Sequence, residues 1–260
     1  MRKIELDYQK NVRDIGGLTG FNGKKVKEGR IFRGGFLGHV SRKDIAKIKS
    51  LNLTDIVDFR SPAEFTDRPD HKFKGVTYHN FPVLDDSMDN DLKGSNEFDD
   101  SNLLWFLGGS TDGYGHMCRI YKESLATKAG TKAYKEFFKV LLKDDKRVVY
   151  FHCSQGKDRA GIAAYLLEIA LGVSHEDALN DYLLTNEAMI PRLENMKKQV
   201  KNRPFFNEEY SKAMDEVFAV EVDYLNSAVK EANHKYGSIM NYIKDILEVD
   251  VEKLRKIYLE

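Results

Sequence analysis

Cysteine is scarce in this chain of 260 residues, which contains only Cys118 and Cys153. Two thiols cannot form a disulfide framework, and a chain of this length can build its core without one. We therefore expect a protein with reduced thiols, located in the cytoplasm. The N-terminus MRKIELDYQKN is charged and lacks a long apolar run, so no secretory signal is predicted, while export without a cleaved signal stays open.

An excess of charge of either sign is also missing. Lysine and arginine number 41, aspartate and glutamate number 41, and the formal net charge is zero. A balanced chain has no general attraction for nucleic acid or anionic membranes, so neither partner is predicted. No apolar stretch reaches the roughly 18 residues of a membrane-spanning helix, so no integral membrane segment is expected. Any binding of anions must depend on a local site.

Short apolar strands alternate with helices through the first two thirds of the chain. The runs that predict strands are 31–32, 54–59, 76–83 and 147–151, and those that predict helices start at Ser41 and Ser61 and cover 119–142 and 162–171. Strands that alternate with helices indicate an α/β fold with a mostly parallel central sheet flanked by helices. The chain after residue 174 is mostly helical. No linker divides it, so a single domain over 1–260 is expected.

One stretch breaks this pattern. Residues 85–100, DDSMDNDLKGSNEFDD, are acidic and have no period. Such a composition is typical of a solvated surface insertion, here expected over 85–118, and a flap near the functional site is the alternative.

The segment HCSQGKDR, residues 152–159, lies between a predicted strand and a predicted helix. The five residues between Cys153 and Arg159 are enough for the backbone to curl into a cup whose N–H groups converge on one anion. The following helix adds the partial positive charge of its N-terminus, and Gly156 permits a tight or left-handed turn. The predicted phosphate-binding residues are Ser154, Gln155, Gly156, Lys157, Asp158 and Arg159.

The same field stabilises a thiolate at Cys153, which is then a nucleophile. Attack on phosphorus would give a cysteinyl-phosphate intermediate, and water would hydrolyse it. Arg159 would hold two phosphate oxygens with its planar guanidinium. The sequence therefore predicts a phosphate-monoester hydrolase that needs no cofactor and no metal, since no second pair of cysteines or histidines has ligand spacing.

The leaving oxygen needs a proton, and spacing alone does not select its donor. Asp158 is one candidate, Asp58 at a strand end is another, and Asp85 or Asp86 after the next strand is a third. His152 is expected to be buried and to orient Cys153 by hydrogen bonding.

Two further interpretations concern cations near the loop. Lys157 is either a surface lysine, a partner of Asp158 or a contact for a second phosphate. Arg13 and Asp14 are expected to form a structural ion pair under the loop.

HCSQGKDR resembles the HCxxGxxR signature of the cysteine-based tyrosine phosphatases, and HCxxGKDR resembles that of the atypical bacterial members. Residues 11–17 resemble the family's NxRDxGG, 26–33 its VKxGxLFR and 58–61 its DLRS, so the likeness spans nearly the whole chain. The resemblance implies Cys153 as nucleophile, Arg159 as phosphate clamp and Asp158 as acid. It also implies substrates that carry phosphotyrosine, phosphoserine or phosphothreonine, or are phosphoinositides, and a helical lid within 181–235.

Two other classes of function remain possible for a loop of this kind: a binding module, and a transferase or reductase that uses the thiol. A phosphate-binding module without turnover would keep Cys153 and Arg159 but release no phosphate. A sulfurtransferase would accept sulfur from thiosulfate, and an arsenate reductase would need a resolving thiol, for which only Cys118 is present.

The sequence departs from the family at two positions. Gly34 stands where the family tends to have serine, and Ala160 follows Arg159 where it usually has threonine or serine. That hydroxyl normally donates to the leaving thiolate when the intermediate breaks down.

Ala160→Thr should therefore raise turnover if breakdown of the intermediate limits the rate. Burst kinetics with p-nitrophenyl phosphate measure both steps. If breakdown proves limiting and the threonine variant turns over at the wild-type rate, the interpretation of Ala160 is wrong.

Overall fold

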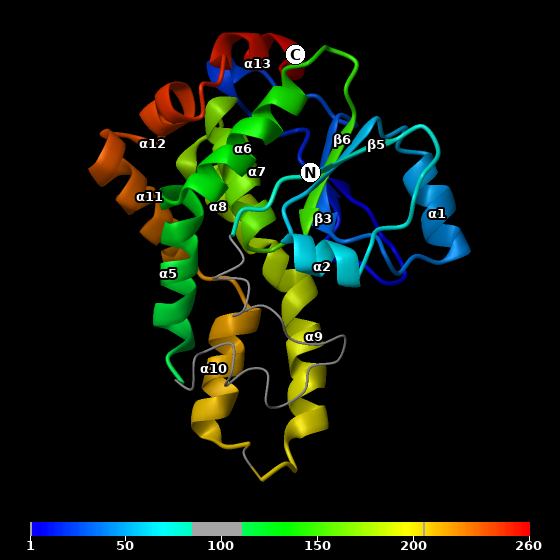
Figure 1. Ribbon diagram of the computed structural model, residues 1–260, viewed down its shortest axis with the longest axis vertical. Coiled ribbons are helices and arrows are strands. Elements are labelled where there is room, and N and C mark those ends of the chain that lie inside the picture. The colour runs from blue at the N-terminus through cyan, green and yellow to red at the C-terminus, as the bar shows by residue number, and fades with distance from the viewer. Residues whose placement is uncertain (1, 85–110, 205) are drawn as a thin grey trace.

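A six-stranded sheet with helices on both faces organises the computed structural model, which describes residues 2–84, 111–204 and 206–260 (Figure 1). In sheet order the strands are β1 (Arg2–Lys3), β2 (Arg13–Asp14), β3 (Ile31–Gly35), β6 (Val149–Cys153), β4 (Asp55–Asp58) and β5 (Thr77–Asn80). β3, β6, β4 and β5 are parallel, and β1 and β2 extend the sheet as antiparallel strands. The predicted α/β fold with a mostly parallel sheet is confirmed.

The central strands are buried on both faces, and alternate side chains enter different cores. From β6, Val149, Phe151 and Cys153 join the larger apolar cluster, while Tyr150 joins the smaller one. Helix α1 (Arg42–Lys49) covers the smaller cluster. The larger cluster receives side chains from α5 (Gly113–Ala126), α6 (Lys128–Leu141), α7 (Arg159–Ala170) and α13 (Val251–Tyr258). A one-residue slip of β6 would exchange these environments, so its register is strongly determined.

Several helix ends form as their sequences predict. Ser41 caps α1 and Ser61 caps α2 (Pro62–Asp67), each in a capping box with the residue three positions later. Gly172 follows α7 with φ +83°, the left-handed conformation in which glycine commonly ends a helix.

The helical segment that precedes β6 differs from its predicted form. Instead of one helix over 119–142, α5 and α6 meet at Thr127, whose side chain accepts a hydrogen bond from the N–H of Gly130 and so caps α6. α5 begins at Gly113, after a cap by Asp112, so residues 113–118 are helical and not part of an irregular insertion. Residues 85–110 of that predicted insertion lie outside the described residues.

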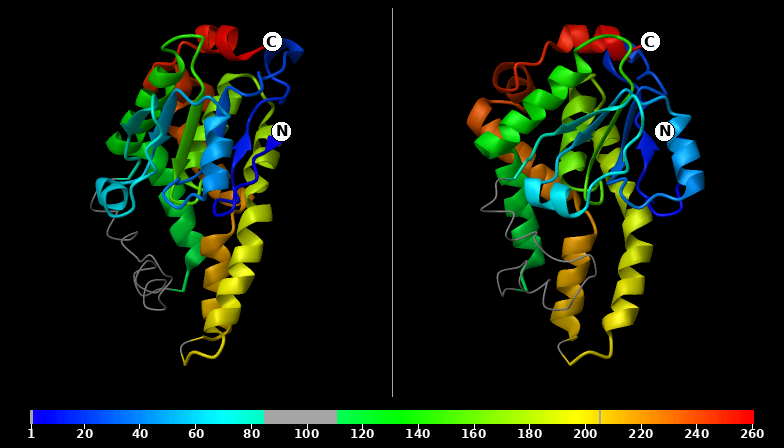
Figure 2. Two further views of the ribbon diagram at one scale, coloured as in Figure 1. Left: turned by 90° about the vertical axis from the view of Figure 1, so that its right-hand side faces the viewer. Right: turned by 45° about the vertical axis from the view of Figure 1, so that its right-hand side comes forward.

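The C-terminal third is helical, as predicted. It contains α8 (His175–Leu183), α9 (Thr185–Val200), α10 (Glu208–Phe218), α11 (Val222–Tyr236), α12 (Ile239–Asn241), the single π turn Tyr242–Ile246 and α13. α9 and α10 extend away from the sheet as a pair, at the end of the molecule where β6 ends (Figures 1 and 2). They share a separate apolar cluster that includes Leu193 and Met214. Within the described residues, no helix is long and apolar enough to cross a membrane.

Gly34 in β3 is tightly enclosed. A Cβ atom there would lie 2.3 Å from the hydroxyl oxygen of Tyr150 and 2.8 Å from Cγ2 of Val12, closer than such contacts occur. The departure from serine at this position therefore has a packing reason.

Gly34→Ser should lower the free energy of unfolding by about 1–3 kcal/mol, the usual range for overpacking a core. Urea denaturation of Gly34→Ser, Tyr150→Phe and the double variant measures this, and the double variant should lose less than the two single losses added together. A serine variant as stable as wild type would show that β3 tolerates the side chain.

Candidate active site

The loop from Cys153 to Arg159 joins the end of β6 to the start of α7, as the sequence predicts. Gly156 has φ +71°, and a Cβ atom there would lie 2.2 Å from the carbonyl of Gly34. A side chain at position 156 would therefore meet both conformational strain and a clash. The predicted tight or left-handed turn at Gly156 is confirmed, and the loop rests directly on the end of β3.

Buried charges hold the loop from behind. Arg33 of β3 donates from Nη2 to the carbonyl of Gly156 at 3.0 Å and from Nη1 to Asp181 Oδ2 at 2.8 Å. Arg13 donates from Nε to the other oxygen of Asp181 at 3.0 Å. The interpretation of Arg13 and Asp14 as an ion pair is wrong, because neighbours on a strand point to opposite faces. Asp14 instead accepts from the N–H groups of Gly16 and Gly29.

Arg159 is held by a carboxylate from another element. Glu64 in α2 accepts from Nη1 of Arg159 at 2.5 Å through Oε2 and from Nη2 at 3.0 Å through Oε1. Ser154 of the loop also donates to Oε1. Nη2 of Arg159 also donates to Ser154 Oγ at 3.2 Å. The pairing fixes the plane of the guanidinium.

This pair stays ionised over the working range of pH. Burial alone would raise the pKa of Glu64, but Arg159 and Ser154 hold that pKa down at about 2. Burial likewise opposes the charge of Arg159, yet Glu64 raises the pKa of Arg159 above its ordinary value. Because the folded pKa of Glu64 is lowered, its contribution to stability is complete above its ordinary value of 4.5 and is lost as pH falls through about 2.

Sequence reasoning missed the role of Glu64. The only signal was its place in the capping box Ser61-Pro62-Ala63-Glu64, where Oε2 accepts from the N–H of Ser61 at 3.2 Å. The same carboxylate thus helps to cap the N-terminus of α2 and also holds Arg159.

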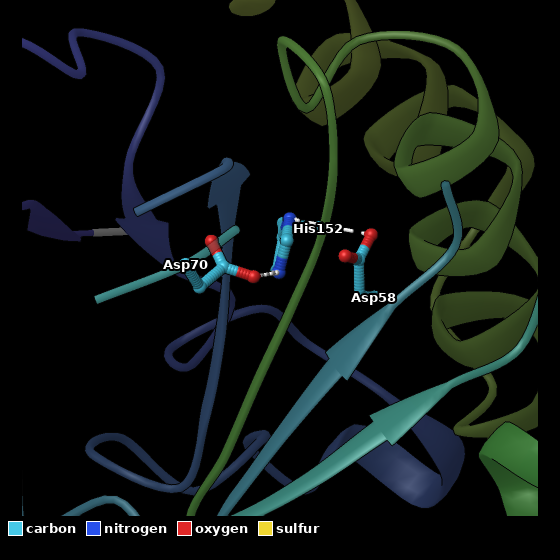
Figure 3. Close-up of side chains that lie close together, drawn as sticks. All are labelled: Asp58, Asp70 and His152. Atoms are coloured by element: carbon cyan, nitrogen blue, oxygen red, sulfur yellow. Dashed lines mark ion pairs between the residues drawn. The ribbon is translucent and has the colours of Figure 1, made fainter. Parts of the chain in front are cut away.

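His152, the neighbour of Cys153 in β6, lies between two carboxylates (Figure 3). Nε2 is 3.1 Å from Asp70 Oδ2, and Nδ1 is 3.8 Å from Asp58 Oδ1 and 3.1 Å from the carbonyl oxygen of Cys153. The predicted burial of His152 is confirmed. Burial lowers the pKa of His152, but Asp70 and Asp58 outweigh it and raise that pKa above the ordinary 6.5. Asp70, whose pKa burial would raise, is held at about 2 by His152 and Arg60.

Asp58, Asp70 and His152, drawn in Figure 3, carry the oxygen and nitrogen atoms that commonly bind metal ions. Their charge is already balanced, because Arg60 Nη2 lies 2.7 Å from Asp58 Oδ2 and 3.2 Å from Asp70 Oδ2. A metal there would have to lie against a buried guanidinium, so the cluster is explained as structural.

Asp58 does not suit the role of acid that the sequence allowed for it. Its exposed fraction is 2%, and both carboxylate oxygens accept hydrogen bonds from Arg60. Asp85 and Asp86 lie outside the described residues.

Asp158, another of the candidates, precedes Arg159 at the start of α7. Its Oδ1 accepts from Lys157 Nζ at 2.8 Å and from the hydroxyl of Tyr121 at 2.7 Å. The interpretation of Lys157 as a partner of Asp158 is confirmed, although its side chain is buried and not on the surface.

Comparison with known proteins decides the family. A sequence profile described as the tyrosine phosphatase family matches residues 4–260. The chain belongs to the tyrosine phosphatase family. A protein of Cupriavidus necator whose name assigns it to the tyrosine-protein phosphatases is 32% identical, over 98% of this chain and 88% of its own. The triple specificity protein phosphatase PtpB of Mycobacterium tuberculosis is 27% identical, over 98% of both chains.

The resemblance of residues 152–159 to this family's signature is thereby confirmed, and the enzyme is a phosphatase that acts on a phosphorylated substrate. A solved structure of kinase associated phosphatase, with serine in place of its catalytic cysteine, aligns with 78% of this chain and 86% of its own. Its TM-score is 0.37 and its sequence identity is 14%.

Glu64→Gln should lower kcat/KM for p-nitrophenyl phosphate by about tenfold to a hundredfold, because the guanidinium of Arg159 loses a charged partner. Steady-state kinetics at neutral pH measure it.

Ser61→Ala is the matched control. It removes the hydroxyl that caps α2 and should cost about 1 kcal/mol of stability, while kcat/KM stays close to wild type. An equal fall of kcat/KM in both variants would assign the effect to the helix end and not to the pair with Arg159.

Proposed function

We propose that this phosphatase hydrolyses phosphate monoesters through a cysteinyl-phosphate on Cys153. The observation that carries the proposal is the bidentate hold of Glu64 on Arg159, within a loop whose first residue is that cysteine. A phosphate dianion would be bound by Arg159 and by the N–H groups of residues 154–159.

In the first step the thiolate of Cys153 attacks phosphorus as the bond to the ester oxygen breaks. Arg159 follows two equatorial oxygens into the transition state, because Glu64 has already fixed its plane. Asp158 gives its proton to the leaving oxygen. The products are the free alcohol or phenol and a phosphate bonded to sulfur.

In the second step water attacks phosphorus and the sulfur–phosphorus bond breaks. The carboxylate of Asp158 takes a proton from that water, and Cys153 leaves as a thiolate. Ala160 offers no hydroxyl to this thiolate. The enzyme returns to its starting state with inorganic phosphate as product.

Substrates of several kinds are proposed: phosphotyrosyl, phosphoseryl and phosphothreonyl proteins, and phosphoinositides. The support is the resemblance of the loop to the atypical bacterial enzymes and the name of the Mycobacterium tuberculosis relative. Because Lys157 is engaged with Asp158, a second phosphate would have to compete with that carboxylate for its ammonium.

We also propose that α9 and α10, within the predicted lid of 181–235, cover the loop when substrate is bound. The support is their position at the end of the sheet where β6 ends (Figure 1). Their separate apolar cluster would let the pair move as one unit.

Cys153→Ser should abolish release of phosphate from every substrate while retaining binding of phosphate esters. A panel of phosphotyrosyl, phosphoseryl and phosphoinositide substrates, read by phosphate release, tests activity and substrate range together. Vanadate should inhibit the wild type, and chelators should not.

Two results would contradict the proposal. A wild-type protein that binds phosphate esters but releases no phosphate would be a binding module. Turnover that survives in Cys153→Ser would exclude the intermediate on sulfur.

A further inference from the structure

Two buried tyrosines, Tyr121 and Tyr182, form a chain of hydrogen bonds that ends at Asp158, the proposed acid. The hydroxyl of Tyr121, on α5, donates to Asp158 Oδ1 at 2.7 Å and lies 2.7 Å from the hydroxyl of Tyr182, on α8. The exposed fractions of Tyr121 and Tyr182 are 0% and 1%. A phenol carries one proton, and that of Tyr121 is directed at the carboxylate, so Tyr182 must be the donor between the two hydroxyls.

Both phenols stay protonated. Burial raises the pKa of Tyr121 well above 10, and the charge of Asp158 raises it further. Burial, followed by Asp158, has the same effect on Tyr182. Tyr121 is therefore a permanent donor to Asp158 at any pH where the enzyme works.

The two oxygens of Asp158 are not equivalent. Oδ1 accepts from Tyr121 and from Lys157, whereas Oδ2 accepts no hydrogen bond among the described residues. A proton added to Oδ1 would displace one of those donors, so Oδ2 is the oxygen on which a transferable proton resides.

We propose that Tyr121, supported by Tyr182, is a positioning residue that holds Asp158 with Oδ2 as the proton-carrying atom and stabilises the carboxylate left after proton transfer. The inference rests on the proposed role of Asp158 as acid. It assigns a catalytic purpose to a buried contact between α5 and the loop, 37 positions apart in sequence.

Other groups also act on Asp158. Lys157 and Arg159 come from its own loop and helix, and the phenols of Tyr134 on α6 and Tyr224 on α11 are close enough to sense its charge. Among the described residues, Tyr121 and Lys157 are the side chains that donate to its carboxylate.

Tyr121→Phe tests the inference through the leaving group. p-Nitrophenolate departs without a proton, whereas the phenolate of phenyl phosphate needs one. We expect kcat/KM, which reports the step that releases the leaving group, to fall about tenfold for phenyl phosphate and less than about twofold for p-nitrophenyl phosphate.

Tyr258→Phe is the matched control, because it also removes a buried hydroxyl, one that donates to the carbonyl of Leu141. It should leave kcat/KM for both substrates unchanged. Tyr182→Phe keeps the donor of Tyr121 and should show a smaller loss of the same kind, which keeps the inference testable if Tyr121→Phe does not fold.

Asp158→Asn separates the inference from the proposed function. One outcome would overturn the role of Tyr121 alone. In it, Asp158→Asn loses kcat/KM for phenyl phosphate only, while Tyr121→Phe behaves like the wild type on both substrates. Equal losses on both substrates in Tyr121→Phe make the contact merely structural and overturn it too. If Asp158→Asn shows no dependence on the leaving group, the assignment of the acid fails first and the inference falls with it.

Discussion

The pair between Glu64 and Arg159 is the constraint on which the rest of the site depends. A buried guanidinium is tolerated only when a carboxylate satisfies part of its charge and several of its N–H groups. Glu64 does so from the side of the guanidinium away from its Nε, and it binds Ser154 in the loop as well. The guanidinium is therefore held in one orientation, and the proposed reaction would need little reorganisation of it.

The same arrangement recurs around the loop, where three other buried cations are also paired with carboxylates from distant parts of the chain. Arg33 and Arg13 share Asp181, and His152 lies between Asp70 and Asp58. Such pairs add little net stability, but removing one partner leaves an unpaired buried charge. They consequently resist rearrangement, and the backbone of the loop rests on a framework with few alternative conformations.

Helix α5 shows how an element can be assigned to the wrong class when its environment is unknown. Its first residues, Gly113 to Cys118, follow an acidic stretch and include two glycines, which argue against a helix. In the structure Asp112 caps this end, and α5 packs against α10 and α11. Tertiary packing outweighs the low helix propensity of these residues, and it brings Tyr121 to the loop between Cys153 and Arg159.

The sequence by itself determined the α/β order, the capped helix starts and the turn at Gly156, because these follow from patterns over a few neighbouring residues. Spacing alone placed Cys153, Gly156 and Arg159 between a strand and a helix. Only the tertiary structure decided the partners: Glu64 for Arg159, Asp181 for Arg13, and Tyr121 for Asp158. These residues are 37 to 168 positions apart. Contacts over such separations depend on how whole elements pack, and no local pattern in the chain encodes them.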